Sequence, residues 1–213
     1  AFQSVSADYF SYAGKEYLVY VDRLSGWPMV KMYNKEATAV MLVTTLRKYF
    51  AATGVPEMFR SDNGPQLKAK YLRDFLAKWG VRISTSSPYY SQSNGHAEVT
   101  VKSVKYLVMK CTKNGNLDTD EFVAALLELR NSPRADGQSP AQVLFGQPIR
   151  SIIPVHKRAY QEIWQKSKQK CYKERSQGSE KAQARYNEDA KPLPEFTVGT
   201  HVNIQHEKTG RWS

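Results

Sequence analysis

Residues 3–22 read QSVSADYFSYAGKEYLVYVD, and this stretch decides the fold class. Its two runs, 3–12 and 15–22, are rich in tyrosine, valine and phenylalanine, which favour β-strands. Ala13 and Gly14 lie between the runs and supply a turn. The stretch therefore predicts a β-hairpin at the start of the chain.

Helices and strands alternate beyond the hairpin. The expected elements are a strand over 27–33, a helix capped by Asn34, a short strand over 55–59, a helix over 72–79, a strand over 81–85, and helices over 96–113 and 119–132. Asp118 and Glu121 have the spacing of a capping box at the start of the last helix. This order predicts a layered α/β domain over residues 1–150.

The composition favours a polyanionic partner. The 213 residues include 31 Lys and Arg against 20 Asp and Glu, a net charge of +11, which favours nucleic acid over an acidic membrane surface. No apolar run approaches 18 residues, so we expect no transmembrane helix. The two cysteines are 60 positions apart, which excludes a disulfide scaffold and a cysteine-based zinc finger.

The C-terminal third differs from the rest in charge and pattern. Residues 156–191 hold ten basic and five acidic residues and no proline, so we expect a basic helical linker over 151–192. That linker is either simply solvated or in contact with phosphates. Residues 196–204 alternate as strands do, and 193–213 are expected to begin a small β DNA-binding domain that is truncated at Ser213.

Three carboxylates occupy positions that local structure does not require. Asp8 lies inside the first strand, where aspartate packs poorly. Asp62 follows the fourth strand in RSDNGP, and Glu98 opens the helix after a polar loop over 86–95. Taken singly, each has an ordinary explanation: an exposed strand position, a turn residue and a favourable partner for the helix dipole.

Together the three carboxylates predict a metal site. The 35 residues between Asp62 and Glu98 suffice for a helix, a strand and a loop that bring both to one sheet edge. Crowded carboxylates repel one another, and Mg²⁺ relieves that repulsion because it prefers carboxylate, water and phosphate oxygens. Two such ions can activate an attacking oxygen and stabilise a leaving oxygen at a phosphodiester.

The helix that Glu98 opens has two distinct faces. Glu98, Lys102 and Lys105 share one face by their spacing. The expected buried stripe on the other consists of Val101, Val104, Leu107, Val108 and Cys111. The residues of the polar face form either a plain salt bridge or a surface that binds a DNA backbone beside a metal at Glu98.

Five stretches carry a family resemblance: DYF at 8–10, VDRLSGWP at 21–28, RSDNGPQ at 60–66, PYYSQSNGHAE at 88–98 and SPAQVLFG at 139–146. Over roughly residues 1–150 the chain resembles the integrase catalytic core of gypsy-like long-terminal-repeat retrotransposon Pol polyproteins, within the retroviral integrase superfamily. The resemblance implies an RNase H-like fold, with a five-stranded mixed sheet flanked by helices. Asp22 in the second stretch is interpreted as ending a strand rather than as catalytic.

The resemblance also implies a site with two Mg²⁺ or Mn²⁺ ions. Asp8 would bridge both ions, while Asp62 would hold one and Glu98 the other. Lys102 and Lys105 match positions that approach the ends of the element's DNA, and Gln92 matches a loop residue near the reacting strand. Tyr90, in the same loop, can stack on an unpaired base.

The implied activity is that of a polynucleotidyl transferase and endonuclease. Water cuts near the 3′ end of the element's DNA, and the freed 3′ hydroxyl then attacks target DNA, with no covalent protein intermediate. The implied partners are double-stranded DNA and at least one further copy of the chain, with no membrane. We expect nuclear action preceded by a cytoplasmic particle. Because the family's zinc domain does not precede Asp8, we expect cutting and the reverse reaction rather than paired-end integration.

Two alternatives stay open at this point. The chain could be a domesticated or inactive integrase that serves as a DNA-binding or assembly module. It could also be another RNase H-like nuclease or a transposase. Loss of Mg²⁺-dependent nicking in an Asp62→Asn variant would argue against the first, and a comparison of RNA–DNA hybrid with DNA duplex would test the second.

Overall fold

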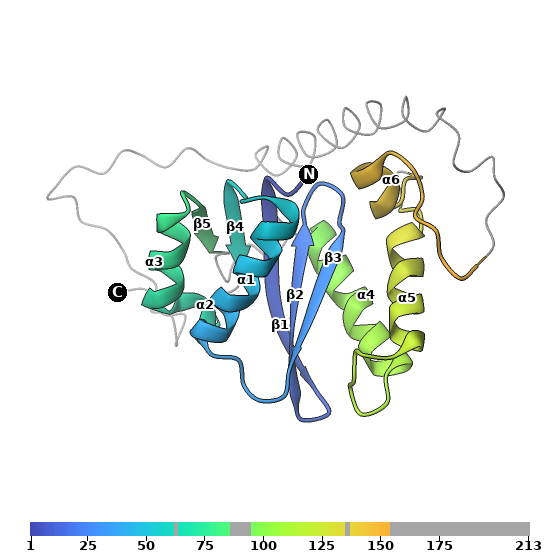
Figure 1. Ribbon diagram of the computed structural model, residues 1–213, viewed down its shortest axis with the longest axis horizontal. Helices are drawn as coiled ribbons and strands as arrows, with labels where there is room; N and C mark the ends of the chain where they lie inside the picture. The colour runs from blue at the N-terminus through green and yellow to red at the C-terminus, as the bar shows by residue number, and fades with distance from the viewer. Residues whose placement is uncertain (62–63, 86–94, 135–136, 154–213) are drawn as a thin grey trace, which may run out of the picture. The chain divides into compact units, whose positions relative to one another are not determined.

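The structure is a computed structural model that describes residues 1–61, 64–85, 95–134 and 137–153, and at 65, 85 and 95–98 it describes the backbone alone (Figure 1). The strands are β1 (Ser4–Tyr12), β2 (Lys15–Asp22), β3 (Pro28–Tyr33), β4 (Met58–Ser61) and β5 (Arg82–Thr85). The helices are α1 (Ala39–Thr53), α2 (Pro65–Lys68), α3 (Lys70–Lys78), α4 (Gly95–Cys111), α5 (Asp120–Asn131) and α6 (Pro140–Phe145). The predicted linker and C-terminal β domain lie outside the described residues, except for 151–153.

The five strands form one mixed sheet in the order β3-β2-β1-β4-β5. The first three strands are antiparallel neighbours, whereas β4 runs parallel to β1 and β5 runs parallel to β4. The helices α1 and α3 lie on one side of this sheet, and α4 and α5 lie on the other (Figure 1). The predicted five-stranded mixed sheet flanked by helices is therefore confirmed.

The predicted hairpin is confirmed at its turn. Tyr12 pairs with Lys15, so only Ala13 and Gly14 connect the strands, and both have positive φ, 51° and 71°. Two consecutive positive φ values are typical of the type I′ turn, whose twist matches that of the flanking strands.

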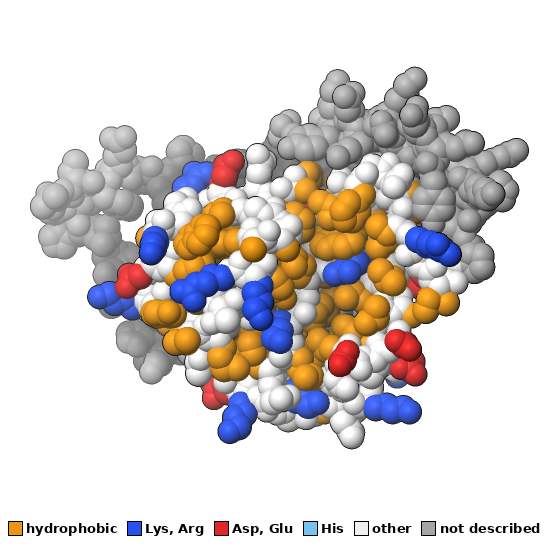
Figure 2. Space-filling model, in the orientation of Figure 1, with side chains coloured by type: hydrophobic (Ala, Val, Ile, Leu, Met, Phe, Trp, Pro, Cys, Tyr) orange, Lys and Arg blue, Asp and Glu red, His pale blue; other side chains and the backbone are white. Residues whose placement is uncertain are grey.

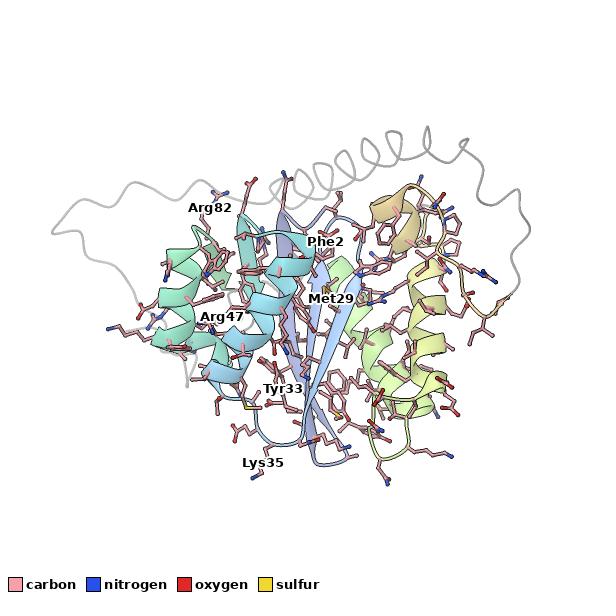
Figure 3. The ribbon with its side chains drawn as sticks, in the orientation of Figure 1. Phe2, Met29, Tyr33, Lys35, Arg47 and Arg82 are labelled. Carbon is pink, nitrogen blue, oxygen red and sulfur yellow. The ribbon has the colours of Figure 1, made fainter. Side chains whose placement is uncertain are left out.

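Alternation along β1 divides the core in two. Val5 and Ala7 are buried against the α1 and α3 side, in a cluster that includes Phe2 and Tyr33 (Figure 3). Phe10 is buried on the opposite side with residues of α4 and α5, among them Val104, Val108 and Phe122. Because strand side chains alternate, Asp8 belongs to the same side as Phe10.

Three predicted boundaries are wrong. Thr38 rather than Asn34 caps α1, and Thr119 rather than Asp118 caps α5, in each case through a 3.3 Å hydrogen bond from a backbone N–H to the threonine Oγ1. The fourth strand spans 58–61 rather than 55–59, because the β1 register pairs Ser4 with Met58. Strand pairing fixes the bounds of β4, and the position of the first helical turn fixes the starts of α1 and α5. Local composition specifies neither.

The outer surface is consistent with the positive net charge. Exposed basic residues follow α1 and α3, and lysine and arginine side chains lie between exposed apolar ones in this view (Figure 2). The basic residues concerned are Arg47, Lys48, Lys70, Arg73 and Lys78. Among the described helices, none combines the length and the apolar character needed to cross a membrane.

Candidate functional site

Asp8 is the one predicted metal ligand whose side chain the structure describes. It is half-buried on β1, and the Tyr9 backbone N–H donates to its Oδ1 at 2.8 Å. Its neighbour on β2 is Val19, and its face of the sheet is the one that α4 covers. The strand thus holds a carboxylate at the boundary between the core and solvent.

The end of β4 lies directly beside Asp8. Ala7 pairs with Ser61, which is the last residue of β4, and the two strands run in the same direction. Asp8 and Asp62 are therefore the residues that follow the two members of one parallel pair. Asp62 itself lies outside the described residues, so the structure does not test its predicted role.

The helix α4 runs along β1 in a definite register. The Lys105 Nζ lies 5.9 Å from the centroid of the Phe10 ring, and the Tyr12 hydroxyl donates to the Met109 carbonyl oxygen at 3.4 Å. Two residues of strand advance about 6.7 Å and four residues of helix about 6 Å, so helix and strand progress together. Asp8 lies two residues before Phe10 on the strand, and position 101 lies four residues before Lys105 on the helix. These two positions are therefore expected at the same level.

This register brings the first two turns of α4 alongside Asp8. Glu98 lies in the first of these turns, although its side chain is outside the described part of the chain. The backbone therefore brings two of the predicted ligand positions to one region of the sheet, 90 positions apart in sequence. Within the described residues no group of three metal-ligating side chains occurs, and neither Asp62 nor the Glu98 side chain belongs to that part.

The predicted division of α4 into two faces is confirmed where side chains are described. Val104 and Val108 are fully buried, whereas Lys102 and Lys105 are exposed. Lys105 also packs over Phe10, two residues from Asp8 on the same face. The other predicted DNA-binding residues, Gln92 and Tyr90, lie outside the described residues.

Sequence reasoning missed an arginine that ties the first turns of α4 to the rest of the domain. Arg134 follows α5, and its Nη2 donates to the Gly26 carbonyl oxygen at 2.9 Å and to the Thr100 Oγ1 at 2.7 Å. Gly26 has a φ of 71°, and a Cβ at this position would overlap the Arg134 guanidinium. Nothing in the local sequence around Arg134 marks it for this contact, which joins three distant segments.

Asp22 is structural, as its interpretation in the sequence suggested. Its carboxylate is fully buried, and its Oδ1 accepts from the Phe2 backbone N–H at 2.7 Å. Its Oδ2 accepts from the Ser25 backbone N–H at 2.8 Å and from the Ser25 hydroxyl at 2.6 Å. These bonds hold the N-terminus and the loop after β2 together, on the opposite face from Asp8.

Comparison with known proteins identifies the domain. Residues 2–91 match the family described as the integrase core domain. Over these residues the chain is therefore similar to an integrase core domain. The matched residues include Asp8 and Asp62 and end before Glu98.

Curated relatives of this integrase core include retroelement proteins. The chain is 32% identical over 138 residues to an uncharacterized protein of Caenorhabditis elegans. It is 31% identical over 140 residues to the Pol polyprotein of feline endogenous virus ECE1. Each alignment covers 64% of this chain, which spans only 11% and 13% of the length of these relatives.

Solved structures confirm the RNase H-like integrase fold. The catalytic core domain of BIV integrase matches with a TM-score of 0.56 and 19% identity, over 68% of this chain and 95% of that one. A chain of the simian T-cell lymphotropic virus intasome, solved in complex with a PP2A regulatory subunit, matches with a TM-score of 0.58 and 24% identity. That match covers 73% of this chain and 58% of the other.

Proposed function

We propose that this integrase core catalyses metal-dependent phosphoryl transfer on DNA, namely 3′-end processing and strand transfer in the integration of a retrotransposon. The observation that carries the proposal is the parallel pairing of Ala7 with Ser61, because an aspartate follows each of them. Neighbouring strands lie about 4.8 Å apart, and an aspartate follows each member of this pair in sequence, so we expect the two carboxylates to lie close together.

The donor set fits a hard divalent cation. Two adjacent carboxylates repel one another, and one would take up a proton unless a cation lay between them. Asp8, Asp62 and Glu98 offer only oxygen ligands, which suit Mg²⁺ or Mn²⁺ and disfavour softer metals. We expect these three residues to hold two ions, with Asp8 common to both. Bound ions would activate the attacking oxygen and stabilise the leaving oxygen of an in-line displacement.

The chain's own side chains would position the DNA. Lys105 is exposed, and its ammonium nitrogen lies 5.9 Å from the centroid of the Phe10 ring, two residues along β1 from Asp8. Lys102 lies one turn before it on the same helix. Both would neutralise phosphates of the element's DNA end, while Gln92 and Tyr90 would contact the reacting strand.

The partners and the site of action follow from the same proposal. The substrates would be double-stranded DNA, as element ends and as target, and a further copy of the chain would complete at least a dimer. One structural relative was solved as part of a viral intasome, which supports an assembly for this chain as well. Because the target would be host DNA, we expect the final step to occur in the nucleus. A cytoplasmic particle would precede it.

Nicking of a short DNA duplex tests the proposal. Wild-type protein is expected to cut with Mg²⁺ or Mn²⁺ and to stop when the metal is chelated, and Asp62→Asn is expected to abolish cutting. Asp74→Asn is the matched control, because Asp74 is an exposed aspartate on α3. Identical product from wild type and Asp62→Asn would favour the DNA-binding module instead. Preferential cleavage of an RNA–DNA hybrid would favour another RNase H-like nuclease.

The double variant Lys102→Ala/Lys105→Ala is expected to bind DNA more weakly. If each lysine neutralises one phosphate, the slope of log K against log salt falls by about 0.9 for each, or about 1.8 in total. Fluorescence anisotropy at several salt concentrations measures this slope. The control is Lys110→Ala/Lys113→Ala, which removes the same charge from the far end of α4 and just beyond it. An unchanged slope in the first variant would refute the assignment of this face to DNA.

A further inference from the structure

Three arginines lie on, or directly after, strands of the sheet face that carries Asp8. Arg60 is on β4 and Arg82 is on β5, while Arg23 directly follows β2. The Arg23 backbone N–H donates to the Ser4 carbonyl oxygen at 2.9 Å, which continues the alignment of β2 with β1. We call Arg23, Arg60 and Arg82 the arginine row.

Strand register places Arg60 near the level of Asp8, and Arg23 and Arg82 one step further along the strands, at the level of Ser4. Ser4 pairs with Met58 and Met58 with Arg82, whereas Ser6 pairs with Arg60. Phe59 and Ile83 pack in the core on the α1 and α3 side, so Arg60 and Arg82 project from the opposite face. Ser6 and Asp8 belong to that same face. Arg60 is therefore one two-residue step, about 6.7 Å along the strands, from the level of Asp8.

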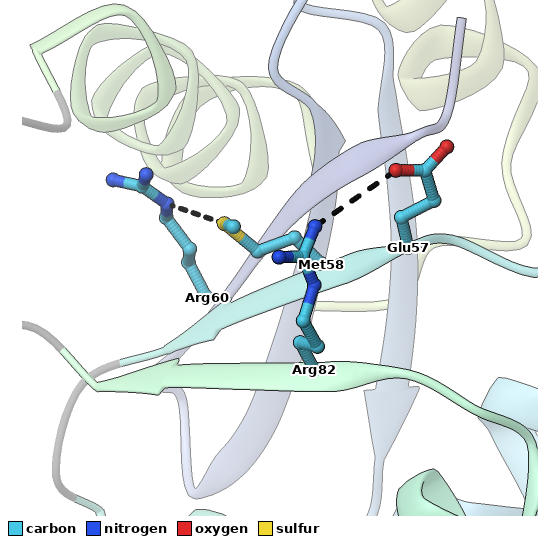
Figure 4. A network of polar contacts seen from close by, with 4 residues as sticks. All are labelled: Glu57, Met58, Arg60 and Arg82. Carbon is cyan, nitrogen blue, oxygen red and sulfur yellow. Dashed lines mark hydrogen bonds and ion pairs between the residues drawn. The ribbon is translucent and has the colours of Figure 1, made fainter.

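Two arginines of the row, Arg60 and Arg82, make side-chain contacts near the start of β4. The Arg60 Nε lies 3.4 Å from the Met58 Sδ, on the same strand (Figure 4). Arg82 lies 3.9 Å from a Glu57 carboxylate oxygen, and their side chains are 72% and 66% exposed. So exposed an ion pair contributes little and leaves Arg82 able to take another anion.

The electrostatics of the row favour an anionic ligand. Burial, together with the nearby positive charge of Arg60, lowers the pKa of Arg23 to about 10. The two guanidinium groups are thus close enough to repel one another, and an anion bound between them would relieve that repulsion. The β1 residues between them are Ser4, which is half-buried, and Ser6, which is buried.

We propose that the arginine row binds backbone phosphates of the DNA strand that leaves the carboxylate site, one or two nucleotides from the reacting phosphodiester. This inference rests on the proposed function for its choice of DNA. Guanidinium groups suit the task because their planar fork makes paired hydrogen bonds to phosphate oxygens. Contacts of this kind position the strand and carry no sequence information, so the row would serve any terminal sequence.

Equilibrium binding of a short duplex, measured by anisotropy in the presence of a chelator, tests the row. The variant Arg60→Gln/Arg82→Gln is expected to lower the slope of log K against log salt by about 1.8, which corresponds to two lost phosphate contacts. The control is Lys31→Gln/Lys35→Gln, which removes the same charge from exposed positions on and just after β3, at the other edge of the sheet (Figure 3). The control is expected to leave the slope within about 0.5 of wild type.

The outcomes separate this inference from the proposed function. If the wild-type protein does not cut DNA and the arginine variant still shows a smaller salt slope, the arginine row is supported and the catalytic proposal is refuted. An unchanged slope, or an equal loss in the lysine control, would overturn the row even in an active enzyme. Thermal unfolding shows whether the variants fold. If Arg60→Gln does not, Arg60→Lys keeps the charge without the fork and is expected to give about tenfold weaker binding at unchanged slope.

Discussion

Replacement of Asp8 by asparagine is expected to lower the rate of metal-dependent DNA cleavage more than about 100-fold and to leave the fold intact. Loss of a residue that merely orients a metal ligand already costs about 10–100-fold, and Asp8 is proposed to contact both ions directly. Asparagine has nearly the same shape, and its side-chain oxygen can still accept the Tyr9 backbone N–H. Its neutral amide cannot supply the charge that holds a hard cation.

Single-turnover cleavage of a labelled duplex at saturating Mg²⁺ measures this effect, with the unfolding midpoint recorded in parallel. Asp118→Asn provides a control for the same chemical change, because Asp118 is exposed ahead of α5. A cleavage rate for Asp8→Asn within about threefold of wild type would contradict a role in metal binding, since even an orienting residue costs more than that.

Replacement of Asp22 by alanine is expected to lower the free energy of unfolding by about 3 kcal/mol or more. The change removes an acceptor of three hydrogen bonds and leaves the Phe2 and Ser25 N–H groups buried without it. Each buried donor that loses its partner costs about 1–3 kcal/mol. The loop after β2 would loosen, and with it the Gly26 carbonyl that accepts from Arg134.

Chemical denaturation with linear extrapolation measures the loss. Asp22→Asn keeps one acceptor oxygen and is expected to lose roughly half as much stability, because its amide can serve only one side of the network. A loss below about 1 kcal/mol for Asp22→Ala would show that water or a local rearrangement satisfies these donors. The contrast with Asp8→Asn is the informative result: one strand aspartate would govern stability and the other activity.

The sequence predicted elements well where one local signal dominates. The hairpin followed from two tyrosine-rich runs around Ala13 and Gly14, and the two faces of α4 followed from the spacing of Val104 and Val108. Helix starts were less predictable, because Asn34 and Thr38 are both good caps and only the position of the first turn selects between them. The short helix α2 between β4 and α3 was not expected at all.

The candidate site was predictable only in part. The odd placement of Asp8 in a strand and the spacing from Asp62 to Glu98 pointed to a shared location, and the β1–β4 register is consistent with that prediction. The tie through Arg134 and the arginine row carried no such signal. The arginine row depends on which residues of different strands come to the same level, and register is a property of the folded sheet. The Arg134 contact depends on how the loop after β2, α4 and the segment after α5 pack together.

The close fit between Gly26 and the Arg134 guanidinium has a consequence for related sequences. A side chain at position 26 and an arginine that reaches the same space exclude each other, so the two positions should change together during divergence. Proteins of this lineage that keep the arginine should retain glycine, and those that have lost it should tolerate asparagine or aspartate there, the residues that best accept a left-handed backbone. Such paired replacement would record, in sequence alone, how the helix bearing Glu98 is fastened in each descendant.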